Sequence, residues 1–407
     1  MAQEQVLGLD IGSSSIKAVV GEAIGPDKVK LHAGFSKPSR GIRRGVVFNM
    51  EEAAGAITSV LQDVKSYSKS ALRNIYLSVG SPDVHTQTSH GIVAVSRANA
   101  EIYKDDVSRV IQASEAVNLS SNRSILHTIT REFVVDDIGD IRDPIGMVGT
   151  RLEITSLIID AFQPNVKNLM KCVELSGGSV SGLIFTPLAS SVAVLTKNQK
   201  ELGVICIDIG YDTTGIAIYE ESKLLHTKTF PIGAGNITKD LAIALKIPFE
   251  AAERLKLSYG YAQAREISSK DTVDLKKIDV ALKGSSSRKF VAEVIEARLS
   301  EICDFVNEEL RSVNRAAKLP AGAVIVGGGA KLPGIADLFR SEFKLSVHIG
   351  LPQPSVFEAA FPDTDELLES PECAAALGLL RWSGELNPQR ISMKGSVIIK
   401  FLKNFLP

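Results

Sequence analysis

The sequence contains the stretch Gly8-Leu9-Asp10-Ile11-Gly12-Ser13-Ser14-Ser15-Ile16-Lys17 near its start and a related one, Cys206-Ile207-Asp208-Ile209-Gly210-Tyr211-Asp212-Thr213-Thr214-Gly215, near its middle. In both, an apolar run typical of a buried strand leads to an aspartate, and a glycine follows two residues later. A hydroxyl-rich turn and a second β-rich run come next, so each stretch predicts a β-hairpin. A single turn of this composition is common in β-hairpins and indicates no ligand. Two copies in the same order predict two related domains that face each other across a ligand.

The two hairpin tips have the composition of a phosphate-binding site. Glycine and hydroxyl residues offer backbone N–H groups and hydroxyls that can wrap phosphate oxygens. Asp10 and Asp208 precede the tips, and each can hold a hydrated Mg²⁺ through its waters. We therefore predict a clamp for a magnesium-bound nucleotide. The predicted contacts are Gly12, Ser13, Ser14, Ser15 and Lys17 in the first hairpin, and Gly210, Tyr211, Asp212, Thr213 and Thr214 in the second.

A third stretch predicts the other end of the nucleotide site. Ala323 to Val326 reads as a buried strand, and Gly327, Gly328 and Gly329 follow it, with Lys331 shortly after. Glycines let the backbone lie flush against a flat ligand because no Cβ intrudes. A side chain at Gly327 is therefore expected to take the place of the adenine ring.

Two further features are candidates for ribose contacts. Gly233, Gly235 and Asn236 open a predicted helix, and glycine-rich backbone entering a helix N-terminus can bind an anion or a ribose. Glu253 and Lys256 lie on one face of the next predicted helix. They form either a surface ion pair worth roughly a few tenths of a kcal/mol or a contact to the ribose and base.

The three motifs, in this order, resemble the phosphate, phosphate and adenosine motifs of the actin superfamily. That resemblance implies an α/β fold of two actin-like (ribonuclease H-like) ATPase domains that bind ATP and Mg²⁺. Within the superfamily, the segment 83–162 resembles the insert of the FtsA cell division family, with His127, Asp143-Pro144 and Gly146-Met147. FtsA proteins bind ATP, assemble into actin-like filaments and recruit FtsZ, the tubulin-like division protein, to the cytoplasmic face of the membrane at the division site. These properties are what the resemblance implies here.

Length and pattern divide the chain into several parts, because 407 residues exceed a single core. The insert is predicted as a β-α-β-β block with a helix that Asp105 can cap. The predicted parts are residues 1–82 (first domain, first part), 83–162 (insert), 163–198 (first domain, second part), 199–372 (second domain), 373–383 (closing helix), 384–394 (linker) and 395–407 (amphipathic helix).

Composition excludes several classes of function. The net charge of −1 gives no field that would attract nucleic acid. Met1 to Gln5 leads directly into the first strand, so no signal peptide is expected. No apolar run reaches the roughly 18 residues of a spanning helix. The four scattered cysteines and six unclustered histidines give no metal-site spacing.

The last residues predict a membrane contact. Lys400 and Lys403 lie on the narrow face of a predicted helix whose broad face is apolar, which suits an interfacial helix. The alternative is a terminal helix docked on the protein. The predicted lipid-facing residues are Val397, Ile398, Phe401, Leu402, Phe405 and Leu406.

One absence and one basic segment complete the predictions. The stretch Thr186 to Leu195 has no carboxylate or amide side chain, although superfamily members that cleave ATP efficiently tend to place one here, so at most slow hydrolysis is expected. FtsZ tails are acidic, and a lysine-rich segment of the second domain is a candidate receptor, with a solvated face as the alternative. Its residues are Lys276, Lys277, Lys283, Arg288 and Lys289.

Two other functions remain open on sequence grounds. A sugar kinase of the same superfamily would need an acidic general base and no amphipathic tail. A scaffold of the PilM type in pilus assembly is also actin-like, and it would lack the terminal membrane helix.

Overall fold

Two central sheets with the same strand order form the body of the protein. The computed structural model describes residues 5–25, 28–97 and 99–383. The first sheet has the order β11-β6-β1-β2-β3-β19, and the second has the order β14-β13-β12-β17-β18. In each, an antiparallel three-strand meander is extended on its first strand by a parallel strand, β6 or β17. The duplicated hairpins therefore belong to duplicated sheets, as the repeated sequence pattern predicts.

The first domain is a sheet covered on both faces. Its strands are β1 (Val6–Ile11), β2 (Ser15–Gly25), β3 (Lys28–Pro38), β6 (Ile75–Val79), β11 (Val180–Phe185) and β19 (Phe357–Ala359), with the small hairpin β4 (Ile42–Arg43) and β5 (Val46–Val47). Its helices are α1 (Met50–Tyr67), α3 (Gln163–Leu175), α4 (Thr186–Val194), α10 (Asp365–Leu368) and α11 (Ala374–Ser383). β1 and β6 are buried apolar runs because helices cover both faces.

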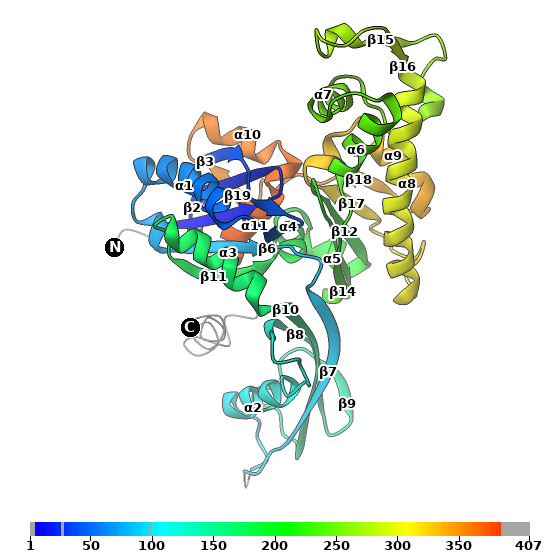
Figure 1. The fold of residues 1–407 in the computed structure, drawn as a ribbon. Coiled ribbons are helices and arrows are strands. Elements are labelled where there is room, and N and C mark those ends of the chain that lie inside the picture. Colours follow the sequence, from blue (N-terminus) through cyan, green and yellow to red (C-terminus); the bar gives the residue numbers. More distant parts are fainter. Residues whose placement is uncertain (1–4, 26–27, 98, 384–407) are drawn as a thin grey trace.

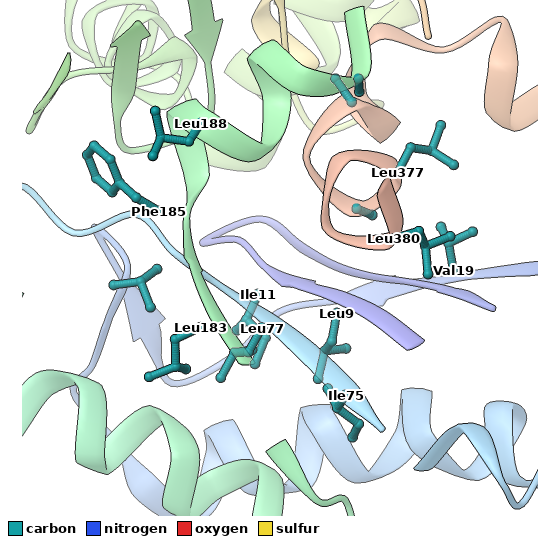
Figure 2. Close-up of a cluster of buried hydrophobic side chains, with 14 of the residues drawn as sticks. Leu9, Ile11, Val19, Ile75, Leu77, Leu183, Phe185, Leu188, Leu377 and Leu380 are labelled. Carbon is teal, nitrogen blue, oxygen red and sulfur yellow. The ribbon is translucent and has the colours of Figure 1, made fainter. Parts of the chain in front are cut away.

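The closing helix α11 follows the second domain in sequence but packs on the first strands of the first domain. Leu377 and Leu380 of α11 pack over β1 and β2, on the face of the sheet opposite α1 and α3, with Leu188 of α4 nearby (Figure 2). Gly378 of α11 lies so close to Ala189 of α4 that any Cβ would overlap it. The segment after the second domain thus returns to the first and fixes α4, which leads into the second.

The second domain contains the second meander and a helical layer. Its strands are β12 (Val204–Ile209), β13 (Thr214–Glu220), β14 (Lys223–Phe230), β17 (Ala323–Val326) and β18 (Val347–Ile349), and the hairpin β15 (Thr272–Asp274) with β16 (Ser285–Ser287). Its helices are α5 (Lys197–Leu202), α6 (Ala234–Leu245), α7 (Phe249–Tyr259), α8 (Arg288–Ser312) and α9 (Ile335–Phe343). The long helix α8 buries one apolar stripe, which includes Ile295, Leu299 and Val306, against this layer.

The insert lies between β6 and α3 and extends away from the first sheet (Figure 1). It contains β7 (His85–Ala94), α2 (Lys104–Ser114), β8 (Arg123–Val135), β9 (Ile138–Ile141) and β10 (Arg151–Phe162), in the sheet order β7-β10-β8-β9. Arg131 on β8 donates to the carbonyls of Leu224, at 3.2 Å, and Leu225 in β14. The insert therefore contacts the second domain as well as the first.

Two sequence predictions for the insert are wrong in detail. The block has one more strand than β-α-β-β, because β9 is only four residues long and too short to show a period. The N-cap of α2 is Tyr103, whose backbone N–H donates to Asp106 at 2.9 Å, and Asp105 does not cap the helix.

Candidate functional site

The two predicted hairpins have the same local geometry. Gly12 N–H donates to the carbonyl of Ser15 at 3.1 Å, and Gly210 N–H donates to that of Thr213 at 2.8 Å. In both hairpins the residue before the glycine pairs with the residue that ends the turn, Ile11 with Ile16 and Ile209 with Thr214. The strands flanking both turns belong to the meanders of the two sheets. The same turn is therefore presented once by each domain.

Each hairpin places one aspartate beside a serine from a neighbouring element. Ser78 of β6 donates to Asp10 at 2.7 Å, and Ser190 of α4 donates to Asp208 at 2.5 Å. Burial raises the pKa of Asp208 to about 6; the charge of Asp10 acts in the same direction, while Ser190 and the charge of Lys17 oppose it. The two carboxylates are close enough to repel each other, and a divalent cation between them would relieve that repulsion.

The residues present fit a magnesium-bound phosphate chain. Two partly exposed carboxylates suit a Mg²⁺ that keeps most of its waters. A Cβ on Gly12 would lie 2.9 Å from the Ser15 carbonyl, and one on Gly210 would lie 3.0 Å from that of Thr213. Both turns therefore need glycine to stay tight. Among the described residues, no group of three or more His, Cys, Asp or Glu side chains forms a metal site built from protein ligands alone.

The hydroxyl residues of the tips differ in what they offer to a ligand. Lys17 Nζ donates to Ser15 Oγ at 2.8 Å, so a cation lies beside the first turn. Thr214, by contrast, is fully buried, and its hydroxyl donates to the carbonyl of Ile232 at 2.8 Å. The prediction that Thr214 contacts the nucleotide is wrong, because this residue already begins β13.

Asp212 at the second tip contacts the first domain. Its carboxylate accepts a hydrogen bond from the backbone N–H of Arg44 at 3.2 Å. Arg44 lies in the turn between β4 and β5, and the neighbouring Gly45 has a φ of +71° and packs against Gly80 and Ser81. The basic loop around Arg44 therefore contacts the second hairpin, where the two domains meet.

The three glycines of the adenosine motif have different roles. Gly327 has a φ of +85°, and a Cβ there would lie 2.5 Å from the Ile209 carbonyl and would also meet the Asp208 carboxylate. A Cβ on Gly329 would meet the Ile209 side chain. Only Gly328 opens to free space, with Glu372 Oε2 as its one neighbour at 4.0 Å. A Gly327 side chain would therefore collide with the second hairpin, and its collision with the ligand stays a prediction.

The backbone N–H groups at the start of α6 form hydrogen bonds within the protein. The N–H groups of Ala234 and Gly235 donate to the carbonyls of Gly210 and Tyr211, at 2.9 and 2.7 Å. Asn236 accepts from Gly233 N–H at 3.1 Å, and a Cβ on Gly233 would lie 2.6 Å from the Gly210 carbonyl. The prediction of an anion or ribose site at these N–H groups is wrong, because they hold the second hairpin instead.

Glu253 and Lys256 form a buried network. Lys256 is 6 % exposed, and its Nζ donates to Glu253 at 2.8 Å, to Thr238 at 2.9 Å and to the Ala234 carbonyl at 3.2 Å. Burial lowers the pKa of Lys256, although Glu253 opposes the shift. The alternative of a surface ion pair is therefore wrong, and a ribose contact stays a prediction.

Glu372 joins the site although no sequence motif indicates it. Its carboxylate accepts from Lys331 Nζ at 2.5 Å and lies 3.6 Å from Lys17 Nζ. Burial would raise the pKa of Glu372, but the hydrogen bond from Lys331 and the charge of Lys17 lower it overall. Two predicted cations of the site, Lys17 and Lys331, thus share one carboxylate. The residue follows a proline in an irregular segment, so only the fold reveals it.

The remaining predicted surfaces are distant from the clamp or outside the described residues. The basic segment lies at the tip of the second domain, where Asp271, Asp274 and Asp279 are interspersed among its lysines. Arg288 is 3.8 Å from Asp271 and also donates to the Tyr259 carbonyl. Val397, Ile398, Phe401, Leu402, Phe405 and Leu406 lie outside the described residues. Within the described part of the chain, no helix has the length and apolarity to cross a membrane.

The fold and the site together define a class of protein. The protein has two sheets of the same topology, and each carries a glycine turn beside an aspartate. This arrangement is that of an actin-like protein. Solved structures share this fold: a PilM–PilN type IV pilus biogenesis complex aligns with a TM-score of 0.68 at 18% identity, over 94% of this chain and 99% of that one. MreB5 of Spiroplasma citri bound to ADP aligns with a TM-score of 0.53 at 13% identity, over 96% and 97% of the two chains.

Sequence comparison then gives the family. The family model "Cell division protein FtsA" matches residues 205–378, and "SHS2 domain inserted in FTSA" matches residues 82–159. The cell division protein FtsA of Pseudomonas aeruginosa is 31% identical over 97% of this chain and 92% of its own length, and that of Bacillus subtilis is 34% identical over 86% and 79%. The chain belongs to the FtsA family of cell division proteins.

Proposed function

We propose that the protein binds ATP with Mg²⁺ between its two domains, assembles into filaments on the cytoplasmic face of the membrane, and tethers FtsZ there at the division site. The observation that supports this most is the pair of matching hairpins with facing aspartates, in a chain of the FtsA family. In this proposal Asp10 and Asp208 orient the waters of the metal. The glycine turns and Lys17 bind phosphate oxygens, and the adenosine part lies against Gly328.

We propose that the nucleotide is mainly structural. Helix α4 passes beside the second hairpin, and its polar side chains there are serines: Ser190 donates to Asp208, and Ser191 is hydrogen-bonded to Tyr219 at 2.8 Å. Neither side chain is a general base of the kind that activates a water or a sugar hydroxyl. This favours slow hydrolysis over the sugar-kinase alternative, which an ADP-release assay over a panel of sugars would revive if turnover exceeded about once per second.

Membrane attachment should depend on assembly. A single amphipathic segment with two phenylalanines binds a bilayer reversibly, because partial insertion and the ordering of the segment offset much of the burial energy. A filament would place many copies on one surface and add avidity without new contacts. This proposal rests on the sequence of residues 397–406 alone.

Co-sedimentation tests both parts of the proposal. Purified protein with ATP should pellet with liposomes, and should carry FtsZ into that pellet. Phe401→Glu, or deletion from Val397 onward, should leave a folded protein that no longer pellets with liposomes. Lys403→Glu is a control that should have the smaller effect. Liposome binding that survives the deletion would show that the tail is a docked helix.

The PilM-type scaffold remains the second candidate, because a PilM–PilN complex is among the solved structures that share the fold. The insert match and the identity to FtsA proteins favour the division function. The same pelleting experiment separates the two, since a pilus scaffold of this kind would not bring FtsZ to liposomes.

A further inference from the structure

The segment that carries Glu372 connects the adenosine motif to the first domain. Gly327 N–H donates to the carbonyl of Pro371 at 3.0 Å, so this segment is held against the glycine turn. One residue after Cys373 the chain enters α11, which packs on β1 and β2. The position of Glu372 is therefore fixed from both sides, by the second domain before it and by the first domain after it.

The Glu372 carboxylate lies between cations from the two domains. Lys331 belongs to the 3₁₀ turn Gly328–Lys331 of the second domain, and Lys17 belongs to β2 of the first. Ser370 Oγ adds a hydrogen bond at 3.3 Å. The Lys17 side chain is only 14% exposed, so its charge is poorly screened by water and depends on its neighbours. The only carboxylate in ion-pair distance of Lys17 among the described residues is Glu372.

A carboxylate in this position opposes an incoming phosphate chain. Phosphate oxygens that reach Lys17 must share it with Glu372, and the two anions repel each other. That repulsion grows with the charge of the nucleotide. ATP without metal carries about four negative charges near pH 7, and a bound Mg²⁺ removes two of them. The penalty from Glu372 is therefore about twice as large for metal-free ATP.

We propose that Glu372 is a specificity-determining residue that makes the cleft discriminate against metal-free nucleotide. Its carboxylate forms ion pairs with Lys17 and Lys331, so these cations are less available to phosphate. It also repels any phosphate chain whose charge is not reduced by a divalent cation. The inference rests on the proposed nucleotide binding and deepens it. Lys17 and Lys331 then have two roles: they attract phosphate, and they hold the carboxylate that selects among phosphate ligands.

Calorimetry on the full chain tests the proposal. Glu372→Gln keeps the size of the side chain and removes its charge. We expect its affinity for ATP in EDTA to rise by about tenfold and its affinity for Mg-ATP to rise by about threefold, as halving the charge halves the interaction free energy. The matched control is Glu369→Gln, the same change at an exposed position three residues earlier, which should alter neither affinity.

A double-mutant cycle identifies the route of the effect. Lys17→Met should weaken binding of both forms of ATP, and in that background Glu372→Gln should gain clearly less than tenfold, because one of the two shared cations is absent. Circular dichroism confirms that each variant is folded. Equal affinities of Glu372→Gln and wild type for metal-free ATP would overturn the inference alone. A wild-type protein that binds neither form of ATP would overturn the proposed function as well.

Discussion

The two hairpins share a turn but differ at the residue that pairs with the aspartate. Opposite Asp10 on the adjacent strand lies Lys17, and opposite Asp208 lies Gly215. Lys17 projects a cation toward Ser15 and Glu372. Gly215 has no side chain, and a Cβ there would lie 2.6 Å from Pro187 of α4. The first copy therefore supplies a charge beside its turn, whereas the second leaves room for the helix that connects the domains.

The two copies of the motif also differ in how closely other elements surround them. The second hairpin is surrounded by protein: α4 covers Gly215, Gly327 packs on Ile209, and the start of α6 caps the Gly210 turn. The first hairpin is less enclosed, with Ser14 exposed and Lys17 partly exposed. Substitutions at Gly215 should therefore act on the fold, and substitutions at its counterpart Lys17 should act on the ligand.

Exchanging the paired residues gives the largest expected effects. Gly215→Lys would push its side chain into Pro187 and should lower the free energy of unfolding by about 3 kcal/mol. Lys17→Gly should change it by less than about 1 kcal/mol, yet weaken Mg-ATP binding by roughly tenfold. Urea denaturation and calorimetry on the same two variants measure both quantities. Equal losses of stability would contradict the division of roles.

The glycines of the adenosine motif allow a second test. Gly327→Val should destabilise the protein by about 3 kcal/mol, because it combines a positive φ with a collision against β12. ATP binding should be lost with it. Gly328→Val should keep the stability of the wild type, since its side chain meets open space, and should weaken ATP binding by at least about tenfold. If Gly328→Val binds ATP normally, the adenosine part lies elsewhere.

The raised pKa of Asp208 predicts that the stability of the protein depends on pH. The pKa of Asp208 is raised to about 6 in the folded protein, mainly by burial, against about 3.9 for an ordinary aspartate. The native state thus holds its proton longer, so this group contributes stability that is present below about pH 4 and is lost as the pH rises to about 6. Without nucleotide, Asp208→Asn should be more stable than wild type at pH 7 by on the order of 2 kcal/mol, with little difference at pH 4.

Urea denaturation at the two pH values checks this expectation. Asn can still accept the hydrogen bond from Ser190, so the substitution removes the charge and little else. Asp10→Asn should show a smaller gain at pH 7, because it relieves only the repulsion on Asp208. If Asp208→Asn is less stable than wild type at pH 7, the ionised carboxylate stabilises the folded state instead of destabilising it.

The smallest expected effect concerns a surface far from both hairpins. Changing Arg288 and Lys289 to Glu should reduce FtsZ co-pelleting by a few-fold and leave ATP binding intact, because charge contacts at an exposed surface are weak. The acidic residues interspersed among the lysines reduce the expected effect further. Unchanged co-pelleting would place the FtsZ receptor on another surface.

The sequence predicts the parts of the site that depend on local pattern. Both hairpins, the strand before Gly327 and the insert are local features with their own periodicity and turn residues. Ser78, Ser190 and Glu372 are not, because each comes from a separate element and meets the site only in the folded chain. Ser190 lies in the stretch Thr186 to Leu195, whose sequence has no pattern that would indicate a contact with Asp208. The glycines before α6 suggested a ligand because the sequence cannot show that the second hairpin uses their N–H groups.

The central claim is that the two hairpins hold a magnesium-bound nucleotide between Asp10 and Asp208. Calorimetric titration of Asp208→Ala with Mg-ATP tests it most directly, with Cys206→Ala, two residues earlier in the same buried strand, as the matched control. We expect Cys206→Ala to bind like the wild type and Asp208→Ala to show no binding at concentrations that saturate the wild type. An unchanged affinity in Asp208→Ala would contradict the assignment of the site.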